Sequence, residues 1–365
     1  MTDLFLENII KAVIETAFKD SFNVLLSKKV LVIVLVHIGD VAKLAGVSSA
    51  TVSRVINGTA KVNEEKRRRV LAAISETGFK PNEIARSLYK KSSRVIGYIV
   101  PSILNIFLNE IGRAIEDEAF RNGFKMILCN SDENPKKETA YINMLSAMNA
   151  DGIIITANNE HLEEEIRSCH IPIVVLDKNA GTSYTASVQS DNYEGGRISA
   201  EYLIECGCRH IVMMRGPQQY VSSQQRFLGY VDVCNEHGIQ PLFVNSQYTF
   251  QNGIESSREI LRRFPEVDGI LASTDMVALS LYKVLCEQGK RVPEEIMIVG
   301  YDGLELSELM TPALTTVVQP TEQIGRLAAK LIIDQVANKP IENRENILPV
   351  ALKVRDTTMN KSASE

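Results

Sequence analysis

Polar and aromatic side chains stand where several apolar segments of this chain end. Arginine and aspartate hold hydroxyl groups by charge-assisted hydrogen bonds, and aromatic rings cover C–H faces, so such a set suits a polyhydroxylated ligand. The candidates are Asn105, Phe107, Asp177, Ser222, Arg226, Tyr248, Thr274, Asp275, Asp302 and Gln319. Taken singly, each is more often a helix cap or a surface group, and Asp275 and Asp302 would both serve as N-caps. Only their common placement predicts a binding site.

A second set of candidates lies near the N-terminus, in residues 38–57. The apolar spacing predicts two short helices, with Gly46 in the turn between them and Ser48 or Ser49 capping the second. Val52 points inward, which leaves a small, polar outer face that can enter a DNA major groove. The alternative is an ordinary helical hairpin. The candidate DNA contacts are Ser49, Ala50, Thr51, Ser53, Arg54 and Asn57.

The segment that follows predicts one more stable helix and one marginal one. A third helix opens at residues 63–65 and stops at Gly78, and the basic run at residues 66–69 forms either phosphate contacts or a solvated face. Residues 81–88 are too few for a stable isolated helix. Leu88 has no local core to join, so it is a candidate wedge in a minor-groove base step, unless it packs on the next domain. The other candidate DNA contacts there are Asn82, Ala85, Arg86 and Ser87.

From residue 94 onward, short apolar runs alternate with amphipathic helical stretches. This alternation is typical of parallel sheets whose two faces are covered by helices. The length favours two doubly wound lobes with a ligand cleft at the carboxyl ends of the strands. The fold class predicted is α/β, with an all-α helix-turn-helix head and a two-lobed parallel-sheet body. The predicted strands are residues 95–100, 125–129, 152–156, 173–176, 210–214, 269–272 and 296–299.

Charge is distributed unevenly along the 365 residues. The net charge is −5, but residues 38–94 carry twelve Lys or Arg against five Asp or Glu, a local +7 that leaves −12 for the rest. A basic segment on an acidic body suits a protein that docks one end onto phosphates. Hydrophobic content of 45% is that of a soluble globular protein, and the six cysteines form no disulfide framework, which favours a reducing cytoplasm.

Enzymatic and metal chemistry are not expected. The chain has no G-x-S-x-G, no G-x-x-x-x-G-K-[ST] and no H-E-x-x-H motif. Cys206 and Cys208 lie near His210, but a zinc site needs four ligands, usually in two separated pairs, and no second pair exists. No catalytic residue, metal or cofactor is therefore predicted.

Residues 1–37 fit the rest of the chain poorly. The run VLVIVLV at residues 30–36 follows two lysines, as in a signal peptide or a stub of a membrane helix, but it is too short to span a bilayer. A local strand or helix is a further alternative. We favour an extension that belongs to no folded unit.

The motifs together resemble one family. DVAKLAGVSSATVSRVING and GFKPNEIARSL are similar to the head piece of LacI/GalR bacterial repressors, and IPIVVLD, VGYDG and PALTTVVQP are similar to their body. The resemblance covers about residues 38–358, and within the family it is strongest to ribose-operon repressors. It implies the domain boundaries 1–37 extension, 38–80 DNA-binding head, 81–93 hinge helix and linker, 94–358 effector-binding and dimerisation body, and 359–365 tail.

The resemblance also implies a mechanism. A homodimer reads a pseudo-palindromic operator, paired hinge helices open the minor groove with Leu88, and a small molecule, most simply ribose or a related sugar, controls affinity from the cleft. Ser49, Ala50 and Arg54 fall at base-reading positions. Tyr220 stands where the purine repressor has a ligand-binding arginine, which disfavours a purine. The effector-contacting positions implied are Phe107, Asp177, Arg226, Tyr248, Asp302 and Gln319.

Other functions remain open at this stage. A catabolite-control regulator would use a phosphocarrier protein as corepressor. An exported sugar-binding transport protein would share the two-lobed body behind a signal peptide, but it would not carry the helix pair or the basic segment. A sugar-processing enzyme is disfavoured because no catalytic motif is present.

Overall fold

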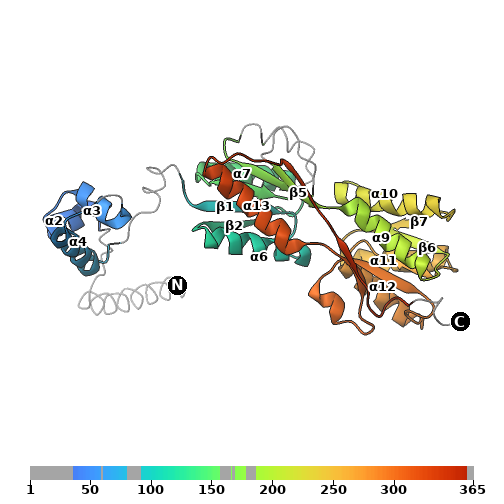
Figure 1. Cartoon of the computed structure of the whole chain (residues 1–365). Coiled ribbons are helices and arrows are strands. Elements are labelled where there is room, and N and C mark those ends of the chain that lie inside the picture. The colour runs from blue at the N-terminus through green and yellow to red at the C-terminus, as the bar shows by residue number, and fades with distance from the viewer. Residues whose placement is uncertain are drawn as a thin grey trace, which may run out of the picture. The chain divides into compact units, whose positions relative to one another are not determined.

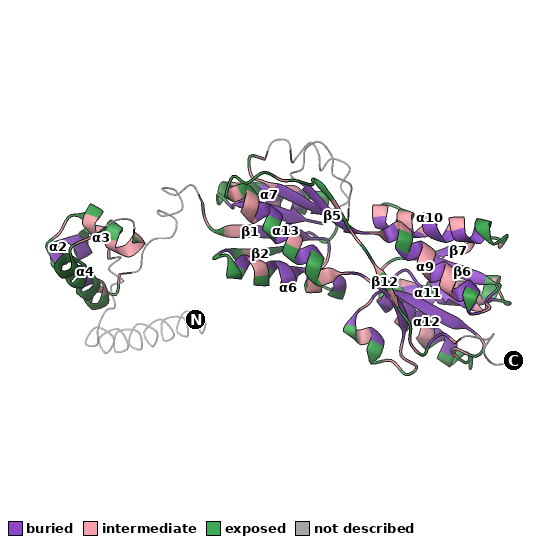
Figure 2. Cartoon of the chain, in the orientation of Figure 1, coloured by how far each residue is buried: buried purple, intermediate pink, exposed green. Residues whose placement is uncertain are grey.

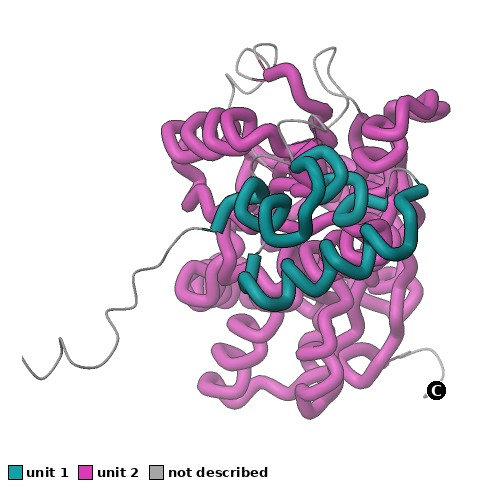
Figure 3. The backbone as a smooth tube through the Cα atoms, turned by 90° about the vertical axis from the view of Figure 1, so that its left-hand side faces the viewer, with its two compact units in different colours: residues 1–83 teal, residues 84–365 magenta. Residues whose placement is uncertain are grey.

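The computed structural model describes residues 36–58, 61–79, 92–156, 166, 169–177 and 186–359. The chain divides into two compact units, residues 1–83 and residues 84–365, which Figure 3 draws in different colours. Within the described residues, no helix combines the length and the apolar character needed to cross a membrane. Residues 1–35 of the predicted extension (1–37) and residues 81–91 of the predicted hinge and linker (81–93) lie outside the described residues, so the predictions made for them stay predictions.

The first unit contains the predicted helix pair and the third helix. Gly46 ends the first helix in the left-handed region at φ 63°. Ser48, not Ser49, caps the second helix, and its hydroxyl accepts a hydrogen bond from the Thr51 N–H. Val52 is fully buried with residues of the other two helices. The helices are α2 (Ile38–Ala45), α3 (Ser49–Asn57) and α4 (Glu64–Thr77).

The second unit contains two six-stranded sheets, which define its two lobes (Figure 1). The strand order is β2-β1-β3-β4-β5-β11 in the first lobe, where all pairs are parallel, and β7-β6-β8-β9-β10-β12 in the second, where only the β10–β12 pair is antiparallel. The strands are β1 (Val95–Val100), β2 (Lys125–Asn130), β3 (Gly152–Ile155), β4 (Ile173–Leu176), β5 (Ala186–Ser190), β6 (Ile211–Arg215), β7 (Leu242–Asn245), β8 (Gly269–Leu271), β9 (Met297–Asp302), β10 (Thr315–Val318), β11 (Glu345–Leu348) and β12 (Ala351–Lys353).

Helices cover both faces of each sheet. In the first lobe, α13 lies beside α6 although the two are far apart in sequence (Figure 1), and α7 packs on the opposite face. In the second lobe, α9 and α10 cover one face, and α11 and α12 cover the other. The helices are α6 (Ile106–Arg121), α7 (Pro135–Ala147), α9 (Asn192–Glu205), α10 (Val221–Glu236), α11 (Phe250–Arg263), α12 (Asp275–Glu287) and α13 (Thr321–Val336), with a 3₁₀ helix η1 (Glu305–Glu308).

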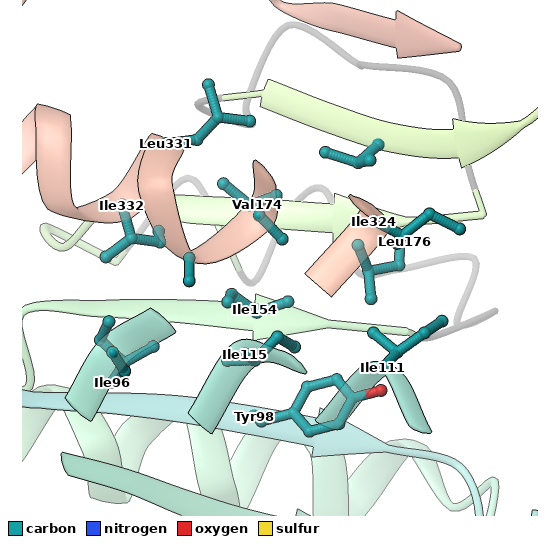
Figure 4. Close-up of a cluster of buried hydrophobic side chains, with 14 of the residues drawn as sticks. Ile96, Tyr98, Ile111, Ile115, Ile154, Val174, Leu176, Ile324, Leu331 and Ile332 are labelled. Carbon is teal, nitrogen blue, oxygen red and sulfur yellow. The ribbon is translucent and has the colours of Figure 1, made fainter. Parts of the chain in front are cut away.

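Burial on both faces explains the uninterrupted apolar runs in the central strands. In β3, Ile154 packs in the cluster beneath α6 and α13 (Figure 4), whereas Ile153 and Ile155 pack on the opposite side. Figure 2 shows the same buried interior in both lobes. The predicted two-lobed α/β body is therefore confirmed, with its strand ends directed toward a common region.

Some strands were missing from the prediction. β5 reads ASVQS and β10 reads TTVV, and their serine and threonine side chains are buried. β7, β11 and β12 are short strands with exposed positions near the sheet edges. None of these five is a continuous apolar run, and the central strands are predicted from such runs, so the same pattern does not predict these five. β9 also extends to Asp302, which ends the strand instead of following it.

Candidate nucleic-acid interface and effector pocket

The outer face of α3 is available for a partner. Ser49, Ala50 and Arg54 are exposed, and Thr51, Ser53 and Asn57 are half-buried. The Asn57 side-chain amide donates hydrogen bonds to the backbone oxygen of Ser53 (2.9 Å) and to its hydroxyl (3.2 Å). Asn57 therefore stabilises the end of the helix, and Arg54 is the single charged group on this face.

The basic run predicted at the start of α4 is also at the surface. Residues 66–69 are all exposed, and Val70 behind them is fully buried, so the run is held on an ordered helix. The Arg69 guanidinium lies near Gly46, in the turn between α2 and α3. The predicted hinge contacts lie outside the described residues. They are Asn82, Ala85, Arg86, Ser87 and Leu88.

A small pocket lies between the two lobes of the body. Four predicted residues line it, one from the first lobe (Asn105) and three from the second (Tyr248, Thr274 and Asp302). Asn105 caps α6 and follows β1, and Thr274 caps α12 and follows β8, so both stand beyond the carboxyl ends of parallel strands. The pocket is thus where the topology predicts a ligand.

Arg226 is the most tightly held of the predicted effector contacts. Its side chain is buried on α10, its Nε donates to Asn192 Oδ1 (2.8 Å), and its Nη1 donates to the Ser273 backbone oxygen (2.9 Å). The guanidinium also lies 3.6 Å from the centroid of the Tyr301 ring. These contacts hold the buried cation in one orientation, so a ligand bound there would not have to order it.

Glycines let α9 approach α10 closely enough for this arrangement. A Cβ at Gly196 would lie 2.1 Å from the Arg226 backbone oxygen, and a Cβ at Gly229 would lie 2.2 Å from the Tyr193 backbone oxygen. Such distances are far below a van der Waals contact. The two glycines therefore set the helix spacing that brings Asn192 within reach of Arg226.

Electrostatic interactions join Arg226 to two carboxyl groups. Burial raises the pKa of Asp302 well above its ordinary value and raises that of Asp177 as well, while Arg226 opposes both shifts. Burial alone would lower the pKa of Arg226, but nearby Tyr301, Tyr248 and the two carboxyl groups leave it raised. The result is a buried cluster of fixed hydrogen-bond donors and acceptors.

Two further features of this cluster are typical of binding sites. Asp177 and Asp302 have φ angles of 55° and 121°, in the region that favours glycine, and such strain concentrates at binding sites. Among the described residues, the buried Ser190 and Ser273 hydroxyls and Gln319 Oε1 have no hydrogen-bond partner, although Gln319 Nε2 donates to Asp302 (2.8 Å). Buried polar atoms of this kind usually have a partner, so a polar ligand would satisfy them.

Three other predicted residues are placed elsewhere. Phe107 packs in the core beneath α6 and α13, and Ser222 is buried in the first turn of α10. Asp275 is not an N-cap, because Thr274 caps α12. The Asp275 carboxylate instead accepts hydrogen bonds from the Leu304 N–H (2.8 Å) and the Thr316 hydroxyl (2.6 Å). Asp302 is not an N-cap either, since it ends β9.

Sequence reasoning missed the apolar part of the pocket lining. The strand-end pattern indicates polar groups only, whereas apolar neighbours of the predicted residues line the pocket too. They are Leu104, Ile106, Met276 and Leu304. Their position next to Asn105, Asp275 and Gly303 in the chain was the signal that could have found them.

Comparison with known proteins identifies the family of this chain. Residues 37–82 match the family described as "Bacterial regulatory proteins, lacI family", and residues 200–358 match "Periplasmic binding protein-like domain". The chain is 38% identical over 328 residues to the ribose operon repressor of Halalkalibacterium halodurans, which covers 90% of this chain and 98% of that protein. The chain belongs to the LacI family. It is therefore a DNA-binding transcriptional regulator.

Solved structures of LacI-family proteins agree with both units. The lac repressor dimer bound to operator and the anti-inducer ONPF has a TM-score of 0.82 at 27% identity and covers 89% of this chain and 99% of its own. A LacI-family regulator from Enterococcus faecium with bound ribose has a TM-score of 0.66 at 29% identity and covers 73% of this chain and 99% of its own. An exported transport protein is not favoured, because this chain carries the LacI head.

Proposed function

We propose that ribose, or a closely related sugar, binds between the lobes of the body and controls how tightly the protein binds its operator in the cytoplasm. The observation that carries this proposal is the buried Arg226 guanidinium, which is held by Asn192 and the Ser273 backbone oxygen. It interacts electrostatically with Asp177 and with Asp302, which lines the pocket between the lobes. Similarity to a ribose operon repressor and to a ribose-bound regulator supports this class of sugar.

We assign the sugar contacts to the groups around the pocket. Asp302, Asp177 and Arg226 would hold hydroxyl groups, and the Tyr248 ring would cover a C–H face. Asn105 and Thr274 add polar atoms to the pocket lining, and Gln319 holds Asp302 by a hydrogen bond. The remaining predicted residues, Phe107, Ser222 and Asp275, act at most through neighbours.

For DNA, we propose that the protein acts as a homodimer on a pseudo-palindromic site. The exposed α3 face reads bases, with Arg54 as its charged contact, while the basic run of α4 contacts phosphate. Residues 81–90 would become helical only on the operator and insert Leu88 into the minor groove. Leu88→Ala should then weaken operator binding far more than binding to random DNA.

A thermal-shift screen tests the sugar. Full-length protein is heated with ribose, ribose 5-phosphate, xylose, glucose and hypoxanthine. At about 100 times its Kd, a ligand specific for the folded state stabilises by about 2.7 kcal/mol, so ribose should raise the melting temperature of the body. Ribose should also change binding to a DNA site selected from a random pool, and no response to any pentose would overturn the proposal.

A further inference from the structure

One hydrogen bond joins the two lobes beside the pocket. The hydroxyl of Tyr220, the residue that precedes α10 in the second lobe, donates to Glu133 Oε1 at 2.8 Å. Glu133 belongs to the first lobe, in the turn between β2 and α7. The Glu133 side chain is exposed and Tyr220 is half-buried, so the bond lies near the surface of the molecule.

The ring of Tyr220 makes a second contact, with the pocket itself. It packs against the Tyr248 ring, with 5.5 Å between centroids and 40° between planes. Tyr248 lines the pocket and lies so close to Gly216 that a Cβ there would be 2.7 Å from the tyrosine hydroxyl. Tyr248 is therefore held between Gly216 and Tyr220, so Tyr220 supports one wall of the pocket.

The turn that carries Glu133 is itself tied to the opposite wall. Asp132 and Glu133 have successive φ angles of 52° and 54°. Asp132 accepts from Asn130 Nδ2 at 2.6 Å and pairs with Lys137, and Asn130 Oδ1 accepts from the Ile103 N–H at 3.0 Å. Ile103 adjoins the pocket-lining residues that follow β1. Two strained residues held by this network indicate a functional turn.

We propose that Tyr220 is a positioning residue for the effector. Its ring supports Tyr248 against the ligand, and its hydroxyl fastens the second lobe to Glu133 of the first, so the pair slows the opening that releases the effector. This inference rests on the proposed function, in which the effector binds between the lobes. A hydrogen bond to a charged group near the surface should change the release rate by about threefold to tenfold.

Ribose binding to the full-length protein tests this role. Tyr220→Phe keeps the ring and removes the hydroxyl, and Glu133→Asn tolerates the left-handed backbone but is too short to accept the bond. Both variants should speed ribose dissociation by about threefold to tenfold with little change in association, and the double variant should be no faster than either one. Equal dissociation rates for wild type and Tyr220→Phe, or additive effects, would overturn the proposal.

A matched control exists inside the second lobe. The Tyr193 hydroxyl on α9 donates to Asp232 Oδ2 on α10 at 2.8 Å, so Tyr193→Phe removes the same chemistry without touching the lobe boundary. Tyr193→Phe should leave ribose dissociation unchanged. If it has the same effect as Tyr220→Phe, the effect is general loosening of the fold and the positioning role is wrong.

A measurement without sugar separates failure of this inference from failure of the proposed function. Hydrogen exchange reports the opening of two turns. In one, the Asn134 N–H donates to the Ser131 backbone oxygen, and in the other the Tyr220 N–H donates to the Pro217 backbone oxygen. Tyr220→Phe should speed exchange in both turns, and Tyr193→Phe in neither. If wild type binds no ribose but Tyr220→Phe alone speeds exchange in both turns, the sugar assignment is wrong, and the Tyr220–Glu133 bond still restrains the two lobes. Unchanged exchange in Tyr220→Phe rejects the fastening.

Discussion

The head and the body of this protein arrange their proposed functional residues in opposite ways. In the head, Ser49, Ala50 and Arg54 are exposed on a helix whose inner side supplies a small core. In the body, Arg226, Asp302 and Gln319 are buried, charged or polar, and bonded to one another or to neighbours. An exposed polar contact has little effect on folding stability and contributes little binding free energy by itself, whereas a buried charge strongly affects both stability and binding.

This contrast predicts that changes in the body alter the stability of the body and its sugar response together, while changes in the head alter the stability of the head and DNA binding but not sugar binding. The two units have separate cores, since the head cluster contains only residues from Val36 to Phe79. If a substitution in one unit changed the binding function of the other unit in the absence of sugar, the two units would be coupled without effector.

The largest effect is expected from pH, through Asp275. Burial raises its pKa from 3.8 to about 7. The folded state then binds more protons than the unfolded state between these values, so stability falls as the pH rises from about 4 to about 7. Asp275→Asn removes this group, and the fall should shrink by about 4 kcal/mol, at 1.36 kcal/mol per pKa unit.

Urea unfolding of wild type and Asp275→Asn at pH 4.5, 6 and 7.5 measures this difference, with circular dichroism as the signal. Asp191→Asn, which keeps an N-cap for α9, is the matched control and should follow wild type. Asp302 titrates in the same direction and remains in both, so some fall should persist. Parallel stability curves for wild type and Asp275→Asn would contradict the prediction.

The next effect concerns sugar binding. Arg226→Ala removes a guanidinium that is buried beside Asp302 and Tyr301, and it should weaken ribose binding by about 3 kcal/mol, roughly 100-fold. Operator binding should persist and lose its response to sugar, which an operator-release assay measures. Arg226→Lys keeps the charge and controls for collapse of the site. Sugar-dependent release by Arg226→Ala would rule out Arg226 as the central contact.

The same contrast explains what the sequence could predict. In the head, the features are local: Gly46 in the turn, Ser48 at the cap and Val52 inside lie within a few residues of one another, so spacing is sufficient. In the body, the carboxyl ends of strands placed Asn105, Tyr248, Thr274 and Asp302 at one pocket, because topology brings those ends together.

Contacts that depend on packing between distant segments could not be predicted from the sequence. Nothing near Asp275 indicates that its carboxylate bonds to Leu304 and Thr316, which are folded against it from other elements. The bond between Tyr220 and Glu133 joins the two lobes across 87 positions of the chain. The strands with buried serine and threonine escaped detection for a related reason, since only their neighbours make those positions interior.

A smaller effect is expected on the DNA side. Arg54→Ala removes the single charge on the α3 face and should cost about 1–3 kcal/mol at one base pair in each half-site. Ribose affinity should not change, because Arg54 belongs to the separate unit. Fluorescence anisotropy with the selected operator and a scrambled duplex measures both binding modes, and Arg121→Ala, an exposed arginine of α6, is the control. Equal losses on both duplexes would make Arg54 a phosphate contact.

The smallest effect is expected from the cap of α3. Ser48→Ala removes the acceptor of the Thr51 N–H (3.3 Å) and the partner of the Thr51 hydroxyl (3.0 Å), which should destabilise the head by about 1 kcal/mol. Calorimetry should then show a lower melting temperature for the head and an unchanged transition for the body, and Ser48→Asn should restore the cap. Because the DNA contact proposed for the α3 face requires a folded helix, operator affinity should fall with head stability while ribose affinity stays constant. If both transitions moved together, the head and the body would be one cooperative unit, and the separation of exposed and buried sites would not explain how they act.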